Sequence, residues 1–400
     1  MHPTTAPFAV PLPVDVPFAF SLHALAAHLT TLVDQRKPRG MRYPLVPLLT
    51  IAILATLSGH SRVEAIADWA QLRAVELAHL FGLERTTMPH ARTWGRILAY
   101  AVDPTALATM LGQFFQPVLR VGTVPERGSI VVAVDGKTLR GTIPLGQTHG
   151  VHLVAAYLPE SGITLAQLAV DQKTNESTVV PTLLAGLDLT GMVVTGDAMP
   201  CQQALSRQIV DAGGDYLWFV KDNQPTLLAD IQQAFAPTTP LPGWSDPPMD
   251  WTTARTVENG HGRIDERVIT VSSMLQGYSR WPGLAQVFQL QRTVIDGLGQ
   301  QTHEVRYGVT SLPAAVADAQ RLLAIARAEW GIENGLHYRR DVTLQEDASL
   351  LRRGHGPQVL AALNNGVIGV VRQHGEPNLA AVQRRFMRRF DHAINRLGLG

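Results

Sequence analysis

The chain has 400 residues, of which 46% are hydrophobic and 17% are charged, which excludes a disordered protein and leaves enough apolar residues for two or three cores. Its formal net charge of +1 excludes a polycation, although basic residues cluster at 36–42 and 384–389. The single cysteine, Cys201, excludes an internal disulfide and a cysteine-based zinc site, which suits a reducing cytoplasm. The most apolar stretch, residues 45–57, is shorter than the roughly 20 residues of a membrane span, so we expect no membrane partner.

The amino-terminal quarter of the chain is predicted to be helical. Residues 1–20 contain five prolines and no charged n-region, so we expect a flexible lead-in and not a signal peptide. Residues 21–122 carry apolar side chains at spacings of three and four, which predicts an all-α domain. We expect this domain to bind DNA or to assist its binding.

Strand patterns begin after residue 128. Three apolar strands are followed by alternating helices and strands, which predicts an α/β fold with a mixed sheet and flanking helices over 128–400. Residues 237–310 lose the helical period and contain short strand patterns, so we predict a β-rich insertion there. A long helix is expected from Pro313 to about residue 341, with Ser311 helping to cap it.

Two predicted core strands end in an acid. Asp135 follows the apolar run "IVVAV", and Asp197 follows "MVVTG". Ligand-facing groups gather at strand ends in α/β sheets, and carboxylates placed there need a compensating cation. The pair therefore indicates a hard-metal site, the alternative being that each aspartate only caps the turn after its strand.

A third carboxylate, Glu333, lies on the long predicted helix. The i, i+4 and i+7 spacing places Glu333, His337 and Arg340 on one helical face. The alternative is an amphipathic helix whose polar face meets water.

Five ordered blocks carry a resemblance to a known family: "VAVDGKTLRG", "KTNESTVVPTLLAGLDLTGMVVTGDAMPCQ", "GGDYLWFVKDNQPTL", "ENGHGRIDER" and "WGIENGLHYRRDVTLQEDAS". In this order they resemble the insertion-sequence transposases of the ISAs-type, H-repeat-associated group, which are DDE transposases. The segments "LLTIAILATLSGHSRVEAIADWAQ" and "PHARTWGRIL" resemble the amino-terminal part of the same group. The resemblance covers roughly residues 25 to 395.

The resemblance implies an RNase H-like catalytic fold with a β-rich insertion before the last catalytic helix. It assigns Asp135, Asp197 and Glu333 as catalytic acids that bind Mg²⁺, for which Mn²⁺ is expected to substitute. The implied activity is metal-dependent cleavage at insertion-sequence ends and joining of the freed 3′ hydroxyls to target DNA. The expected partners are terminal repeats and target DNA, bound by a homodimer on paired ends in the nucleoid of the cytoplasm.

Polar and basic side chains near these acids are candidate DNA contacts. They are Lys137, Arg140, Lys173, Asn175, Lys221, Asn223, Gln224, His261, Arg263, Arg327, His337 and Arg340. The alternatives are solvated or polar turns for most of them, a hairpin turn in the insertion, and a hydrogen-bond partner for His337.

The chain departs from the pattern of this group on the predicted catalytic helix. Glu329 stands where the group usually has His, Tyr338 where it has Trp, and Arg340 where it has Leu. Two alternatives to a transposase therefore stay open: an RNase H-like nuclease that cuts without joining, and a DNA-binding derivative whose catalysis has lapsed. The carboxylate of Glu329 beside the site is the feature that favours the lapsed derivative.

Overall fold

The computed structural model of the chain describes residues 22–39, 41–115, 125–171, 175–236, 249–260 and 262–388. The predicted lead-in at 1–20, the candidate DNA contacts Lys173 and His261, and parts of both basic clusters lie outside these residues.

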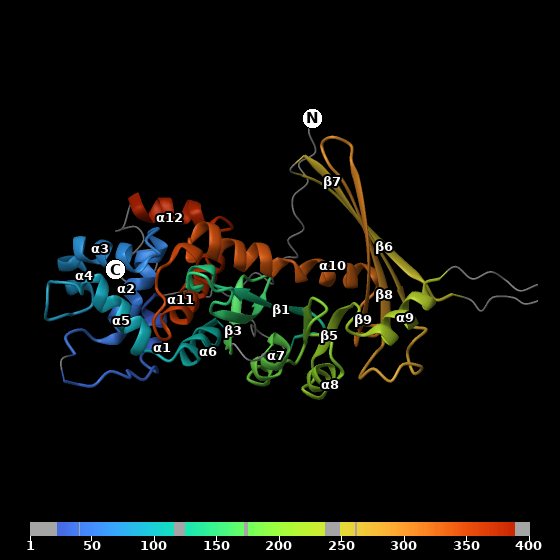
Figure 1. The fold of residues 1–400 in the computed structure, drawn as a ribbon, viewed down its shortest axis with the longest axis horizontal. Coiled ribbons are helices and arrows are strands. Elements are labelled where there is room, and N and C mark those ends of the chain that lie inside the picture. Colours follow the sequence, from blue (N-terminus) through green and yellow to red (C-terminus); the bar gives the residue numbers. More distant parts are fainter. Residues whose placement is uncertain are drawn as a thin grey trace, which may run out of the picture.

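The amino-terminal part is helical, as expected from the sequence. Its helices are α1 (Leu22–Leu29), α2 (Leu45–Leu57), α3 (Val63–Leu72), α4 (Ala74–Leu80), α5 (Ala91–Tyr100) and α6 (Pro104–Phe115). Helix α2 is buried continuously from Leu48 to Leu57 because α1 and α3 pack around it together with α11 (Gly356–Gln373) and α12 (Leu379–Arg388). The carboxyl-terminal helices thus complete the amino-terminal bundle (Figure 1). Within the described ranges, none of the helices combines the length and the apolar character needed to cross a membrane.

A nine-stranded sheet forms the rest of the fold. Its strands are β1 (Ile130–Thr138), β2 (His152–Leu158), β3 (Ile163–Val170), β4 (Met192–Gly196), β5 (Asp215–Val220), β6 (Thr252–Gly260), β7 (Arg263–Ser272), β8 (Gln286–Ile295) and β9 (Gln301–Thr310), in the order β3-β2-β1-β4-β5-β9-β8-β7-β6. Strands β1, β4 and β5 are parallel, whereas β2 pairs antiparallel with β1, and β3 pairs antiparallel with β2 at the edge of the sheet. This arrangement of the first five strands is that of an RNase H-like sheet, which confirms the expected fold class.

Helices cover both faces of the sheet, so β1 is buried as its apolar run predicts. Val131 lies in the core under α10 (Ala319–Glu329), and Val132 lies in the core on the opposite face. On that opposite face, α7 (Glu176–Ala185) packs on β2 and β3, and α8 (Gln203–Asp211) packs on β5. Helix α9 (Pro225–Ala234) lies against β9.

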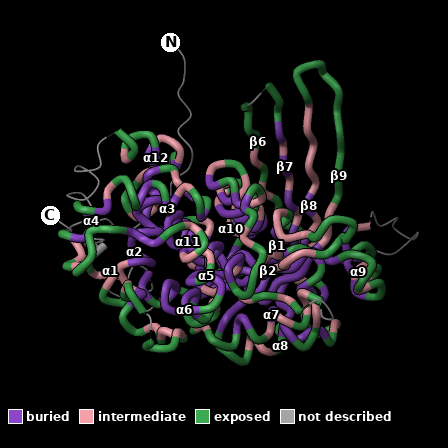
Figure 2. Tube along the Cα trace, turned by 60° about the vertical axis from the view of Figure 1, so that its left-hand side comes forward, coloured by how far each residue is buried: buried purple, intermediate pink, exposed green. Residues whose placement is uncertain are grey.

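The predicted β-rich insertion consists of β6 to β9. These strands have nine or ten residues each and are longer than the short strands expected from the sequence. Strand β9 pairs antiparallel with β5, so the insertion extends the catalytic sheet. Its far end projects from the body of the protein and is exposed (Figure 2).

The prediction of one regular helix from Pro313 to residue 341 is wrong. Helix α10 begins after Asp318, whose carboxylate accepts a hydrogen bond from the Arg321 amide at 2.8 Å. Ser311, the expected cap, instead donates its hydroxyl to Asp215 at 2.7 Å. After Trp330 the chain forms π-helical turns at Glu333–His337 and Arg339–Thr343, and short 3₁₀ turns occur at Arg140–Thr142 and Glu346–Ala348. Turns with i→i+5 hydrogen bonds hold more residues than α-turns and are frequent at functional sites.

Candidate active site

The sheet brings Asp135 and Asp197 side by side, although only Asp197 follows the end of its strand. The prediction that β1 ends at Asp135 is wrong, because β1 continues to Thr138 and Asp135 pairs with Ala155 of β2 within it. Ala133 of β1 pairs with Thr195 of β4, and the two strands are parallel. Two residues further on from each of these lie Asp135 and Asp197. Neighbouring strands lie about 4.8 Å apart, which makes the two positions adjacent. The side chains of Asp135 and Asp197 are 42% and 51% exposed, so both carboxylates are accessible.

Glu333 and His337 reach Asp135 from the first π-helical turn. His337 Nε2 lies 3.2 Å from Asp135 Oδ2, and one ligand atom from each of Asp135, Glu333 and His337 lies within 4.8 Å of the other two. His337 is buried, and its Nδ1 has no hydrogen-bond partner among the residues that the structure describes. Two carboxylates and an imidazole form a donor set that suits Mg²⁺ or Mn²⁺.

Asp197 is held by cationic side chains and lies outside this three-residue group. Its carboxylate accepts hydrogen bonds from Lys221 Nζ at 2.9 Å and from Arg306 Nη2 at 3.1 Å. Partial burial disfavours the charged form, but the hydrogen bond from Lys221 and the charges of Lys221 and Arg306 outweigh it and lower the pKa of Asp197. The structure thus clusters two of the three predicted acids and places the third on the adjoining strand end.

Arg306 is a site residue that the sequence did not reveal. Its guanidinium lies 3.9 Å from the Phe219 ring centroid, 3.7 Å from Glu304 and 3.9 Å from Glu329. The side chain is only 14% exposed and faces the body of the protein from β9. In the sequence, the only sign of this role is that Arg306 falls on the side of a predicted strand that faces the protein interior. One such arginine is too weak a signal to assign a site.

Glu329 lies at the end of α10 and is 8% exposed. Burial raises its pKa to about 7; Arg306 opposes this rise, whereas the charges of Asp197 and Asp135 add to it. Its Oε2 atom accepts no hydrogen bond from any described residue.

Two of the predicted phosphate-binding cations are engaged by carboxylates inside the protein. Lys137 Nζ donates to Asp341 at 2.6 Å, and the lysine side chain is 8% exposed. Arg340 is fully buried, and its Nε donates to Glu346 at 2.7 Å. Arg340 is therefore inaccessible to DNA in this structure, contrary to the expectation from the sequence.

Other candidates lie on accessible surface. Arg140 has an 83% exposed side chain, Arg263 is exposed at the start of β7, and Arg327 forms an ion pair with Glu258. Asn175 is exposed at the amino-terminal end of α7.

The amides of Asn223 and Gln224 tie down the loop that follows Asp197. Asn223 Nδ2 donates to the carbonyl of Ala198 at 2.8 Å, and Gln224 Nε2 donates to the carbonyl of Cys201 at 3.0 Å. Both side chains therefore position the Asp197 loop in this structure.

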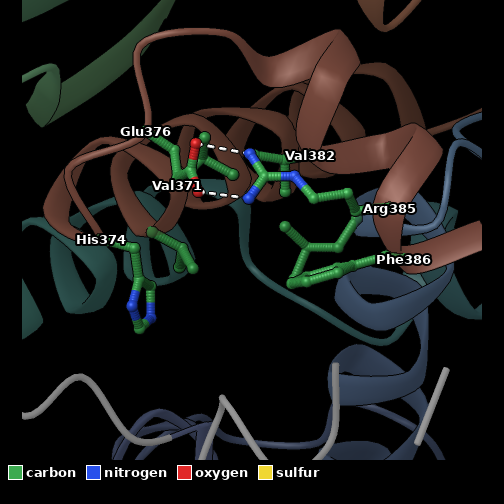
Figure 3. Close-up of a pocket in the computed structure, with 8 residues that line it drawn as sticks. Val371, His374, Glu376, Val382, Arg385 and Phe386 are labelled. Atoms are coloured by element: carbon green, nitrogen blue, oxygen red, sulfur yellow. Dashed lines mark hydrogen bonds and ion pairs between the residues drawn. The ribbon is translucent and has the colours of Figure 1, made fainter. Parts of the chain in front are cut away.

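A cavity of about 170 Å³ lies apart from these acids, between α2, α11 and α12 (Figure 3). Its wall is mainly apolar, with Leu57, Val371 and Phe386 among the lining side chains. The ion pair between Glu376 and Arg385, at 2.6 Å, closes one side. None of the candidate catalytic residues lines this cavity.

Two family models match the chain. The "Transposase DDE domain" matches residues 126–365, and the "DDE_Tnp_1-associated" model matches residues 26–115. The first of these spans β1 to β9, α10 and the π-helical turns. It therefore includes the four acids of the candidate active site, Asp135, Asp197, Glu329 and Glu333.

Several proteins are similar along most of their length. The "Putative transposase YncI" of Escherichia coli O157:H7 is 28% identical over 359 residues, which cover 88% of each chain. The "H repeat-associated putative transposase YhhI" of Escherichia coli K12 is 27% identical over 358 residues, covering 88% of this chain and 90% of that one. An "Uncharacterized protein in dhlA 3'region" of Xanthobacter autotrophicus is 32% identical over 276 residues, covering 67% and 88%.

One solved structure with partial likeness is a cryo-EM structure of the piggyBac transposase synaptic complex with hairpin DNA. It covers 94% of this chain and 79% of its own at 10% identity. The TM-score of 0.38 is too low to equate individual elements.

Proposed function

Because the chain belongs to the DDE transposase family, we propose that it cleaves DNA at insertion-sequence ends and joins the freed 3′ hydroxyls to target DNA. The observation that carries this proposal is the convergence of Asp135, Glu333 and His337 beside the strand end of Asp197. Acids held on adjoining strands suit phosphoryl transfer, in which catalysis depends on positioning and charge stabilisation.

The proposed metal-binding residues are Asp135, Asp197 and Glu333, with His337 as a neighbouring ligand. The ion we propose is Mg²⁺, replaceable by Mn²⁺, because the donors are mostly carboxylate oxygens. When bound, such an ion supplies positive charge to the reacting phosphate and favours deprotonation of the attacking hydroxyl. Lys221 and Arg306 orient the Asp197 carboxylate, and the buried ring of His337 fixes that of Asp135 through the 3.2 Å contact.

DNA is the proposed partner. Arg140 lies two residues after the end of β1, and its exposed guanidinium can meet a phosphate near Asp135. Arg263 offers a second cation on the projecting strands. We propose that the helical amino-terminal part adds DNA contacts and that a homodimer holds paired ends in the nucleoid of the cytoplasm.

A strand-transfer assay tests the proposal. Purified protein, Mg²⁺ and duplexes carrying the repeats that flank its own gene are incubated with a supercoiled target plasmid. Joined products support transposition, and Asp135→Asn and Glu333→Gln should each abolish them because each removes a proposed ligand.

The other outcomes select among the alternatives. Cut ends without joining would indicate a nuclease of the same fold. Repeat binding without cleavage would indicate a catalytically lapsed DNA-binding derivative. Equal joining by the Asp135→Asn variant would contradict the assigned site.

A further inference from the structure

A hydrogen-bonded chain of three side chains lies directly behind Asp135. Thr138 Oγ1 lies 2.8 Å from His152 Nδ1, and His152 Nε2 lies 2.6 Å from Glu176 Oε1. With a proton on Nε2, the imidazole donates to the Glu176 carboxylate and accepts the Thr138 hydroxyl at Nδ1, so each bond has a donor. The chain joins β1, β2 and the first turn of α7.

This chain lies on the opposite face of the sheet from the proposed metal ligands. Successive side chains of a strand point to opposite faces. Asp135 contacts His337 on the face of the π-helical turn, so Gly136 and Thr138 belong to the other face. Glu176 therefore approaches β1 from behind Asp135 and not as a further ligand of the same ion.

Gly136 brings the chain into contact with the backbone of β1. A Cβ atom at position 136 would overlap the Glu176 carboxylate and lie 2.6 Å from His152 Nε2, closer than real Cβ contacts come. Glycine is needed here because of this close approach. The carboxylate and the imidazole thus pack against the strand itself, at the residue that follows Asp135.

The part of β1 that carries Asp135 pairs with a neighbouring strand on one side only. Pairing with β4 extends from Ile130 to Ala133, whereas pairing with β2 continues to Thr138. A glycine within a strand also adds conformational freedom. Beyond Ala133, β1 therefore needs a further contact to keep the Asp135 carboxylate in one place, and the chain to α7 supplies it.

Docking of α7 does not by itself require this polar chain. Val180, Leu183 and Leu184 of α7 are buried in the core and already hold the helix on β2 and β3. The amino-terminal end of a helix favours a negative charge, so the first turn of α7 keeps Glu176 an acceptor for the imidazole. The side chains of His152 and Glu176 are 25% and 21% exposed, which shields their hydrogen bond from water.

We propose that Glu176 is a positioning residue of the candidate active site: acting through the hydrogen-bonded chain, it holds β1 where Asp135 meets Glu333 and His337. This inference rests on the proposed function, because Asp135 is one of the proposed metal ligands. In this role Glu176 contacts neither DNA nor the ion and acts only on the place of the Asp135 carboxylate.

Binding of Mn²⁺ alone to the full chain, followed by electron paramagnetic resonance of the free ion, tests the geometry at Asp135 without any reaction. Glu176→Ala removes the carboxylate and should weaken binding about tenfold, as expected for loss of a group that supports a metal ligand. Glu176→Gln keeps an oxygen that accepts from His152 and should bind within about threefold of wild type. Wild-type affinity in Glu176→Ala overturns the proposal, and so does an equal loss in both variants.

Glu160→Ala is the matched control, because it removes an exposed carboxylate just beyond the other end of β2. It should leave Mn²⁺ affinity within about twofold of wild type. A loss equal to that of Glu176→Ala would indicate a general effect of charge and overturns the positioning role.

Strand-transfer kinetics separate positioning from DNA contact. Glu176→Ala should lower kcat for joining about tenfold while KM for DNA changes less than about twofold, because the acid that supports the reaction is displaced but the DNA surface is kept. A raised KM with unchanged kcat would make Glu176 a DNA contact and overturns the proposal.

Folding and the proposed function are controlled separately. Should Glu176→Ala fail to fold, Thr138→Val breaks the other end of the chain with a side chain of similar shape and should also weaken Mn²⁺ binding; wild-type affinity there overturns the proposal. If the wild-type chain binds Mn²⁺ but joins no DNA, the proposed function fails while the Mn²⁺ comparison still decides the role of Glu176. If Glu176→Ala joins DNA at the wild-type rate, only this inference fails.

Discussion

At the scale of single residues, burial decides what each charged side chain can do. Lys137, Arg340 and Glu329 are all buried, but only the two cations have an oppositely charged partner within hydrogen-bond distance. Arg140, in contrast, is exposed, and its Nε lies 3.9 Å from Asp347, so its guanidinium is accessible to a phosphate. Residue type alone therefore misjudged Arg340, which stabilises the fold instead of facing DNA.

The raised pKa of Glu329 predicts a pH-dependent stability. The unfolded chain ionises this group above its usual pKa of 4.5, whereas the folded chain retains the proton up to about pH 7. The folded state binds more protons in that window, so stability falls as pH rises through it. Glu329→Gln should be more stable than wild type at pH 8, by on the order of 3 kcal/mol, and similar at pH 5.

Urea denaturation of both proteins at the two pH values measures this difference. The same stability difference at pH 5 and pH 8 would show that the Glu329 carboxyl does not titrate in this range.

The buried ion pair of Arg340 predicts a large loss on substitution. Arg340 and Glu346 are 0% and 3% exposed at their side chains, so Arg340→Met leaves an uncompensated carboxylate in the interior. We expect a loss of about 3–5 kcal/mol in the free energy of unfolding, measured by urea denaturation.

Arg140→Met is the matched control for this loss. Its guanidinium is solvated, so stability should change by less than about 0.5 kcal/mol while DNA affinity falls. Equal destabilisation by the two substitutions would contradict the placement of Arg340.

At the scale of elements, the π-helical turn after α10 delivers Glu333 and His337 to Asp135. The turn packs closely on β2, since a Cβ atom at Gly335 would lie within 2.4 Å of the Tyr157 hydroxyl. Glycine is thus required there by close approach and not by an unusual φ. The position of the turn depends on this contact between two distant parts of the chain.

Gly335→Ala should displace the turn and reduce DNA cleavage. The clash with Tyr157 is expected to cost about 1–3 kcal/mol of stability and to move Glu333 relative to Asp135. Cleavage assays on the variant measure the effect. Adding Tyr157→Phe removes the clashing oxygen and should restore part of the activity, whereas no rescue would place the cause elsewhere.

At the scale of the whole molecule, the helical part and the catalytic sheet share one hydrophobic core. Helix α11 packs against α2, α5 and α6 as well as β3, and α6 also packs on β3. At Gly112 a Cβ atom would lie 1.9 Å from the carbonyl oxygen of Leu165, so helix and strand are in backbone contact. The division of the chain into an amino-terminal domain that ends at residue 122 and a catalytic domain that begins at residue 128 remains a prediction.

An isolated fragment of residues 21–122 should therefore fold poorly. Without α11 and α12 the apolar surface of α2 is uncovered, which favours aggregation or a loosely packed state. Circular dichroism during thermal unfolding should show no cooperative transition in the fragment, in contrast to the full chain. A cooperative transition would show that the helical part is an independent domain.

The sequence by itself indicated the core strands and singled out the acids Asp135, Asp197 and Glu333, although β1 continues past Asp135 and Glu333 lies on a π-helical turn. These features follow from local apolar periods and from ordered motifs, which can be recognised within a few residues of each other. The lengths of β6 to β9 and the start of α10 were less well predicted. Ser311 does not cap the helix because its hydroxyl bonds to Asp215, a residue far away in the sequence.

Only the tertiary structure decided which partners these acids receive. Lys221, directly after β5, and Arg306, on β9, both reach Asp197, and the adjacency of these strands depends on the strand order of the whole sheet. The π-helical turns likewise changed the face of Arg340, because the width of a turn depends on the surface against which it packs. Long-range contacts of this kind have no local signature, since the pairing charges lie more than 20 residues apart.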